Sequence, residues 1–329
     1  MTLAAPLRKS WNPWARNENW LDKIETEFGR PDIIHFHGVY YPFQTSLARQ
    51  CRKREWKYVV SVHGGLEKLA QRSKLLKKAL GNFTFHDSFI KEAEAVHVLN
   101  EAEWRSAQAK YPGVKTFVIP NGVSSDIFLM PQAVRPKTSS ISRPLKVGFI
   151  GRIDVKQKGL DFLLRAIKLF EMRHPKADFQ IILVGPFHTL KDKIILMWFL
   201  SSMKSPRKVV LAGSLKGKDK WEMLSNFDVF IHTSRYEGMP GAVIEAMAFQ
   251  LPCILTPATN MQGVIRECEG GWACDATPEA IAETLREVEA DRNEILRRGR
   301  NAREYVQQHL TWDVIAVDYF HQISRLAKG

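Results

Sequence analysis

The sequence predicts an α/β protein with two doubly wound domains, each built on a parallel sheet. Two series of short β-branched runs alternate with longer charged amphipathic segments, which is the pattern of βαβ units. The first series starts at residue 31 and contains IIHFH, YVVSVH, AVHVL and FVIP; the second contains LKVGFIG, FQIILVGP, KVVLAG, DVFIHTS and PCILTP. The length of 329 residues is also sufficient for two cores, because domains commonly have about 100–200 residues.

A segment rich in Pro, Ser and Thr separates the two series. Asn121-Gly122 is a turn signal that ends the first series, and residues 129–144 show no apolar period, which suits a linker. We therefore expect an N-terminal domain over residues 1–128 and a C-terminal domain over residues 145–310. Apolar residues at helical spacing after Pro278 predict closing helices, the last over residues 311–329 and returning toward the N-terminal domain.

The composition favours a basic globular protein. Apolar residues make up 45% and charged residues 25%, which excludes a disordered or fibrous class. The net charge of +13 attracts nucleotides, phosphates or anionic membrane surfaces. Nucleic acid is not expected as a partner, because no recognition module accompanies the charge.

Cysteine spacing and the apolar runs bear on the cellular compartment. Four cysteines without metal-ligand spacing are expected to be reduced, packed thiols of a cytoplasmic protein: Cys51, Cys253, Cys268 and Cys274. The first residues lack the apolar core of a signal peptide, so export is not expected. The longest apolar run, Ile194 to Leu200, is far shorter than the roughly 20 residues that span a bilayer.

The motif RYEGMPGAVIEAMA, residues 235–248, follows a strand-like run and has the form strand, glycine-containing turn, helix. The unpaired amides and the dipole of a helix beginning near Gly241 suit a diphosphate. Glu237 and Glu245 can face one crevice, where carboxylates accept hydrogen bonds from sugar and ribose hydroxyls. The alternative interpretations are a helix-capping Glu237 with a solvated Glu245, or the acid and base of a glycosidase.

A second motif, VGFIGRIDVKQKGLDFLLRA, contains two cations between a strand and a helix. Arg152 offers a planar fork to phosphate oxygens and Lys158 a mobile point charge, so together they could neutralise a diphosphate leaving group without a metal. The alternative is a solvated basic loop. No aspartate cluster of the kind that holds Mg²⁺ is evident, so no metal site and no cofactor are expected.

These motifs in this order resemble the retaining glycosyltransferases of family 4, which have the two-domain GT-B fold. The likeness runs from about Pro31 to the C-terminus and includes IPNGVSSDIF, LVGP, LAGSL and LTPATN. It implies that Arg152 and Lys158 hold the donor diphosphate, that Glu245 binds the ribose, and that Glu237 binds the donor sugar. The donor contacts implied in full are Gly151, Arg152, Lys158, Gly185, Gly213, Leu215, Glu237, Gly238, Met239, Pro240, Gly241, Ala242, Val243, Ile244 and Glu245.

In the N-terminal half, the family's strand-end histidine matches His63 in SVHGG, close to the reacting sugar. His35 and His37 are further candidates, although packed strand histidines are the plainer interpretation. The HFHG and VHGG strings resemble the exopolysaccharide and lipopolysaccharide branch. A basic segment there is either a solvated helix face or a contact with anionic lipid: Arg72, Lys74, Lys77 and Lys78.

The family's opening strand and glycine-rich turn do not appear before Pro31, where the sequence instead has Trp11, Trp14 and Trp20. Two explanations are open: the start is truncated or misassigned, or the acceptor side is naturally reduced. The predicted function is a retaining, metal-independent transfer of a sugar from a nucleotide diphosphate sugar to a glycan or polyprenyl-diphosphate-linked acceptor, with Arg152, Lys158, Glu237 and His63 at the reaction centre. The alternatives are a sugar-nucleotide epimerase and a non-catalytic, membrane-associated partner subunit.

Overall fold

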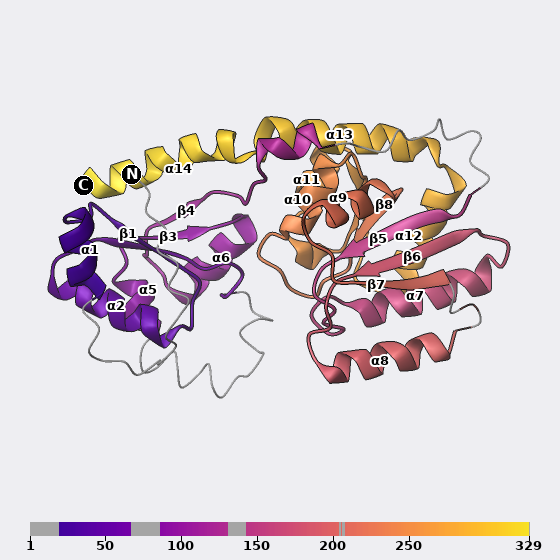
Figure 1. The fold of residues 1–329 in the computed structure, drawn as a ribbon, viewed down its shortest axis with the longest axis horizontal. Coiled ribbons are helices and arrows are strands. Elements are labelled where there is room, and N and C mark those ends of the chain that lie inside the picture. Colours follow the sequence, from indigo (N-terminus) through magenta and orange to yellow (C-terminus); the bar gives the residue numbers. More distant parts are fainter. Residues whose placement is uncertain (1–19, 67–85, 131–142, 204, 206–207, 329) are drawn as a thin grey trace. The chain divides into compact units, whose positions relative to one another are not determined.

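The computed structural model describes residues 20–66, 86–130, 143–203, 205 and 208–328 (Figure 1). The chain divides into two compact units, one of Met1–Val118 with Phe320–Gly329 and the other of Ile119–Tyr319. Each unit contains one fully parallel sheet. The predicted class, two parallel-sheet α/β domains, is confirmed.

The first unit has a four-stranded sheet in the order β1-β2-β3-β4. Its core is formed by the apolar faces of the strands and of the flanking helices, with Val60, Val96 and Phe89 fully buried. Among the described residues, the strand order runs one way without a reversal. In chain order its elements are α1 (Trp20–Phe28), β1 (Ile34–His37), α2 (Pro42–Lys53), β2 (Tyr58–Ser61), α5 (Asp87–Lys91), β3 (Ala95–Val98), α6 (Glu101–Lys110) and β4 (Thr116–Val118).

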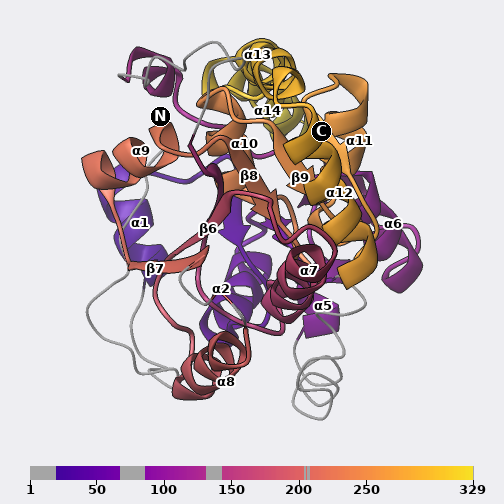
Figure 2. The same cartoon turned by 90° about the vertical axis from the view of Figure 1, so that its right-hand side faces the viewer.

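The second unit has a six-stranded sheet in the order β10-β9-β8-β5-β6-β7. Helices cover it on both faces, and Figure 2 shows α7 and α12, which pack together, side by side on one of them. In chain order its elements are η2 (Ser125–Leu129), β5 (Leu145–Ile150), α7 (Leu160–Arg173), β6 (Phe179–Val184), α8 (Leu190–Ser201), β7 (Val209–Gly213), α9 (Gly217–Ser225), β8 (Val229–His232), α10 (Gly241–Ala248), β9 (Cys253–Leu255), η5 (Pro257–Thr259), α11 (Gln262–Glu267), β10 (Gly271–Ala273), α12 (Pro278–Ala290) and α13 (Asn293–His309).

The edge strand β10 is not among the predicted runs, because its three residues, GWA, lack β-branched side chains. The last helix, α14, covers Trp312–Lys328, and its final residues are grouped with the first unit. Four predicted features lie outside the described residues: most of the 129–144 linker, the basic segment at 72–78, and Trp11 and Trp14.

The segment that follows β4 packs with the second unit. Val123 bridges to Thr311, and Arg303 donates to the carbonyl of Phe128 at 3.3 Å. The units divide after Val118, ten residues before residue 128, where the sequence predicted the end of the N-terminal domain. All four cysteines are free, three of them buried and Cys268 half-buried.

Candidate active site

The centre of the second sheet is the point where the strand order reverses. Strands β5 and β8 are neighbours there, and the chain continues from them toward opposite edges of the sheet. In open α/β sheets, ligands bind in the crevice that this reversal opens at the carboxyl ends of the strands. The loop after β5 carries Gly151, Arg152 and Lys158, and the loop after β8 carries Glu237. The fold therefore brings the two predicted motifs to one place.

Three of the predicted glycines build the edge of this crevice. The amide of Gly151 donates to Val184 O at 2.9 Å, and the amide of Gly185 donates to Gly213 O at 2.7 Å. Gly185 has a φ of +145°, and a Cβ on it would lie 1.9 Å from Gly151 O. Only glycine fits so close an approach at residue 185. The part that these glycines play in joining the strand ends therefore does not depend on a ligand.

The loops after β5 and β8 are joined directly to each other. Thr233 Oγ1 donates to the carbonyls of Lys158 and Gly159 at 3.0 and 3.2 Å, and the amide of Arg235 donates to Gln157 O at 2.8 Å. Gly159 has a φ of +62°, and a Cβ on it would lie 2.0 Å from Thr233 O. These contacts fix Lys158 against the glutamate loop.

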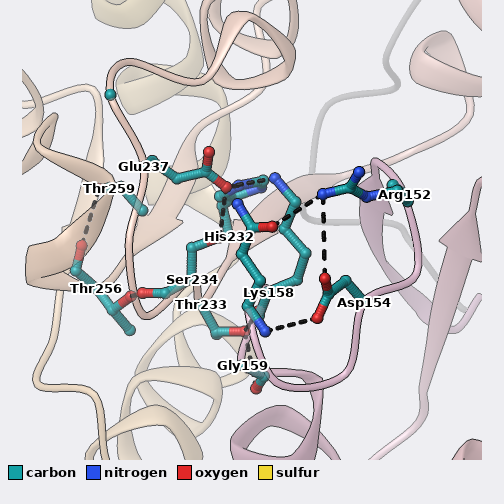
Figure 3. Close-up of polar contacts among 12 residues, drawn as sticks. Arg152, Asp154, Lys158, Gly159, His232, Thr233, Ser234, Glu237, Thr256 and Thr259 are labelled. Carbon is teal, nitrogen blue, oxygen red and sulfur yellow. Dashed lines mark hydrogen bonds and ion pairs between the residues drawn. The ribbon is translucent and has the colours of Figure 1, made fainter. Parts of the chain in front are cut away.

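Lys158 and Glu237 form an ion pair at the centre of the site (Figure 3). Their side chains are 12% and 13% exposed. The same Glu237 oxygen accepts a hydrogen bond from Ser234 Oγ at 2.8 Å and contacts His232 Nε2 at 3.2 Å. The Lys158 ammonium has three N–H groups, so it retains donors for a further anion.

Burial and hydrogen bonding set the charges of this cluster. Burial raises the pKa of Glu237, but the hydrogen bond from His232 and the charge of Lys158 outweigh it and lower that pKa to about 2. Burial lowers the pKa of His232, whose ring stacks on Phe149 at 5.4 Å. His232 is therefore neutral, with Nε2–H donating to the carboxylate. Its Nδ1 is buried and has no hydrogen-bond partner in the described structure.

Arg152 is more exposed than Lys158. Its side chain is 47% exposed, Nη2 donates to Gln157 Oε1 at 2.9 Å, and it lies 4.0 Å from Asp154 Oδ2. The guanidinium shares a loop with Lys158, and both of its partners, Gln157 and Asp154, belong to that same loop. The structure thus fixes one predicted cation on Glu237 and leaves the other at the rim of the loop.

The loop between Glu237 and α10 is held by two asparagines from the family-like motifs. Asn260 donates to the carbonyls of Glu237 and Gly238 at 2.7 and 3.2 Å, and Asn121 donates to Met239 O at 2.9 Å. Helix α10 then begins after Pro240, and no side chain caps it. Gly241 is exposed and Ala242 half-buried, whereas the Val243 and Ile244 side chains are fully buried, so these two can offer a ligand only backbone groups.

Glu245 lies in α10 and is paired with a cation that the sequence analysis missed. Lys220 Nζ, from α9, contacts Glu245 Oε1 at 2.8 Å. The predicted contact Leu215 lies in the loop between β7 and α9, close in sequence to Lys220. Sequence reasoning also missed His232, Ser234 and Asn260. The strings DVFIHTS and LTPATN place these polar residues at the end of a strand or within five residues after it, which was the available signal.

The histidines of the first unit form a cluster at the carboxyl ends of its strands. His37 Nδ1 lies 3.0 Å from His63 Nε2, and Ser61 Oγ lies 2.6 Å from both His35 Nε2 and His97 Nδ1. Burial lowers the pKa of His35 to about 3, helped by the charges of the neighbouring histidines. Burial also lowers the pKa of His37 and His63, so these rings are neutral at pH 7.

The turn that carries His63 is anchored by a buried carboxylate. The Glu103 side chain accepts hydrogen bonds from the amides of Gly64 and Leu99, the latter at 2.7 Å. His63 itself has a φ of +45°. Glu103 therefore fixes the strained turn after β2 to the turn after β3.

No group of three or more His, Cys, Asp or Glu residues within the described ranges is arranged to hold a metal ion. The same ranges contain no helix that is both long and apolar enough to cross a bilayer.

Both halves of the chain match the domains of one known protein family. Residues 5–122 match the glycosyl transferase 4-like domain, and residues 144–291 match the glycosyl transferases group 1 domain. The chain belongs to the group 1 glycosyltransferases. The two matched domains contain the histidine cluster and the Lys158–Glu237 site, respectively.

Three similar proteins show how far the likeness extends in sequence and in fold. An uncharacterised glycosyltransferase of Methanocaldococcus jannaschii is 27% identical over 172 residues, which are 51% of this chain and 42% of that protein. Alpha-galactosylglucosyldiacylglycerol synthase of Streptococcus pneumoniae is 24% identical over 310 residues, which are 90% of this chain and 79% of the synthase. The structure of Anabaena HepE in complex with UDP has a TM-score of 0.72 at 17% identity, covering 93% of this chain and 81% of that one. The match with the archaeal relative thus spans less than half of that relative's length.

Proposed function

We propose that the chain transfers a sugar from a nucleotide diphosphate sugar to a glycan or lipid-linked acceptor, with retention of anomeric configuration. The observation that carries this proposal is the Lys158–Glu237 pair at the strand-order reversal of the second sheet. A cation with free donors stands there beside an ionised carboxylate, next to the uncapped start of α10. That set matches a diphosphate joined to a polyhydroxyl group.

In this proposal the donor is held at both ends. Lys158, Arg152 and the first amides of α10 take the diphosphate, and Glu245 takes the ribose hydroxyls in exchange for its contact with Lys220. Glu237 accepts hydrogen bonds from the transferred sugar with its second oxygen, since the first is occupied by Lys158, Ser234 and His232. The relative with bound UDP supports a nucleotide of this kind.

The reaction breaks the bond between the anomeric carbon and the phosphate oxygen and forms a bond to the acceptor oxygen on the same face. The proton of the acceptor hydroxyl passes to the departing phosphate. Lys158, Arg152 and the helix amides stabilise the negative charge on that phosphate as the bond breaks. We assign to His63 the positioning of the donor sugar, and no metal is needed because these cations supply the charge.

The acceptor is proposed to be a glycan or a lipid-linked sugar, including a polyprenyl diphosphate, used for cell-surface polysaccharide. The name of the pneumococcal relative, a diacylglycerol glycolipid synthase, supports a lipid acceptor. A lipid acceptor requires the enzyme to work at a membrane surface, and the net charge of +13 favours an anionic one. We therefore propose peripheral contact with the cytoplasmic face of the membrane.

The test is to incubate the purified protein with a panel of nucleotide sugars and measure nucleotide diphosphate release, with and without lipid-diphosphate or glycan acceptors. Release that depends on acceptor supports transfer, and the product's anomeric proton coupling reports retention. An isomerised free donor would instead indicate an epimerase. No binding of any donor would indicate a non-catalytic partner subunit, and a loss of rate in EDTA would contradict metal independence.

A further inference from the structure

Helix α8 (Leu190–Ser201) of the second unit is apolar on two faces, and only one of them is covered. Leu196 and Leu200 point into the core and are buried. Leu190, Ile194, Met197 and Trp198 are 72%, 61%, 49% and 65% exposed. Their spacing of four, seven and eight residues from Leu190 places them on one side of the helix. An exposed apolar stripe bordered by charged residues marks an interaction surface, so the outer stripe calls for a partner.

The charges around this stripe select the partner. Lys191 and Lys193 are exposed beside it, and α8 contributes no exposed carboxylate. Its single acid, Asp192, is buried, where it accepts a hydrogen bond from the amide of Val155 at 2.9 Å and another from Thr189 Oγ1. Figures 1 and 2 both show α8 at the outer edge of its unit, beyond α7.

We propose that the outer face of α8 is the surface by which this protein lies on an anionic bilayer. This deepens the peripheral contact proposed above and rests on it. Trp198 and its apolar neighbours would enter the headgroup boundary while the two lysines meet anionic headgroups, as in interfacial amphipathic helices. Pairing of two copies through α8 is disfavoured, because it would bring the lysines of both copies together without an exposed acid on the helix.

The contact would act close to the donor site. The Asp192 bond to Val155 ties the first turn of α8 to the loop that carries Arg152 and Lys158. The connection from β6 to α8 is tied to the same loop, since Ile153 N donates to Pro186 O at 2.8 Å and His188 N donates to Ile153 O at 2.9 Å. A bilayer under α8 would therefore hold the donor loop at the surface where lipid acceptors are anchored.

The experiment measures flotation of the full chain with vesicles of phosphatidylcholine and phosphatidylglycerol in equal parts, and with pure phosphatidylcholine. We expect binding to the anionic vesicles only. Lys191→Gln with Lys193→Gln is expected to weaken it about 30-fold, from about 5-fold per lysine. Ile194→Ser with Trp198→Ser is expected to weaken it at least about 10-fold.

The matched control is Val317→Ser with Phe320→Ser, which removes two similarly exposed apolar side chains, at 56% and 69%, from α14. It should bind like the wild type. Circular dichroism and UDP binding confirm that every variant is folded.

If the Ile194 and Trp198 double variant binds anionic vesicles as the wild type does, α8 is not the membrane-binding surface, and the membrane contact must lie elsewhere on the protein. No wild-type binding would overturn the membrane contact itself, and a dimer that the α8 variant abolishes would make a second copy the occupant. Nucleotide release in vesicle-free solution tests the transfer reaction separately.

Discussion

Replacing Lys158 by methionine separates a structural from a ligand-binding role of its ammonium group. The substitution keeps an unbranched side chain that is one atom shorter, but leaves the Glu237 carboxylate, 13% exposed, without its cation. Removing one partner of a largely buried pair costs about 3–5 kcal/mol, and the remaining exposure and the bonds from Ser234 and His232 favour the lower end. A loss of about 3 kcal/mol lowers the melting temperature of a unit of this size by about 6–12 °C.

The same substitution removes one charge-assisted hydrogen bond to the donor diphosphate. Such a bond contributes about 1.5–3 kcal/mol, so the affinity for UDP should fall about 10- to 150-fold. Scanning calorimetry measures the first effect and isothermal titration calorimetry with UDP measures the second. Both are needed because partial unfolding alone would also weaken binding.

The variant that decides between the roles is Lys158→Met combined with Glu237→Gln. A neutral amide can still accept hydrogen bonds from His232 and Ser234, and it carries no charge that needs a cation. Thermal stability should therefore return to within about 1 kcal/mol of the wild type, while the affinity for UDP stays low. The reasoning is refuted if the double variant regains wild-type UDP affinity, or if Lys158→Met binds UDP normally.

Three further outcomes are expected. Glu245→Ala should weaken UDP binding about 10-fold without changing the melting temperature by more than about 2 °C, since the side chains of its ion pair with Lys220 are 20% and 24% exposed and remain partly screened by solvent. Unchanged affinity by calorimetry would contradict the ribose assignment. Gly159→Ala should destabilise the chain by more than about 1 kcal/mol, because its φ is +62° and the new Cβ would meet Thr233 O; an unchanged urea midpoint would contradict this. The free energy of unfolding should fall as the pH drops below about 6.5, because the pKa of His35 is lowered to about 3 in the folded chain and the unfolded chain binds the proton first. It should fall again below about 4.5, where Glu237 protonates in the unfolded chain but not in the folded one. The urea midpoint measured as a function of pH tests both effects, and His35→Gln should make its fall between about pH 6.5 and 4.5 less steep.

Much of the candidate site in the second unit could be predicted from the sequence because its residues are carried by local patterns. The EGMPG string lies between a strand-like run and a helical run, and the GRID string follows another such run. Strand ends of parallel sheets meet at one edge, so the two motifs had to approach each other once the sheet was inferred. Which residues complete the site did not follow, because Lys220, Asn260 and Asn121 reach it from elements distant in the sequence.

The histidine cluster shows the same limit in the first unit. IIHFH and SVHGG marked His35, His37 and His63 individually. Strand register decides that His37 contacts His63 directly and that Ser61 joins His35 to His97. The carboxylate of Glu103 gave no signal, since a glutamate near a helix start is ordinarily solvated. Its role arises because Glu103 itself is buried, on the side of α6 that faces the turn at Gly64, whereas Glu101 and Ala102 are exposed.

The sequence by itself determined that this chain has two parallel-sheet domains and which loops carry its polar motifs, because alternation and turn chemistry are local properties. Tertiary structure alone decided the partners of those side chains: that Glu237 is ionised between Lys158, Ser234 and a neutral His232, and that one face of α8 is left uncovered. Burial and pairing depend on elements brought together by folding, and a linear pattern does not contain those distances.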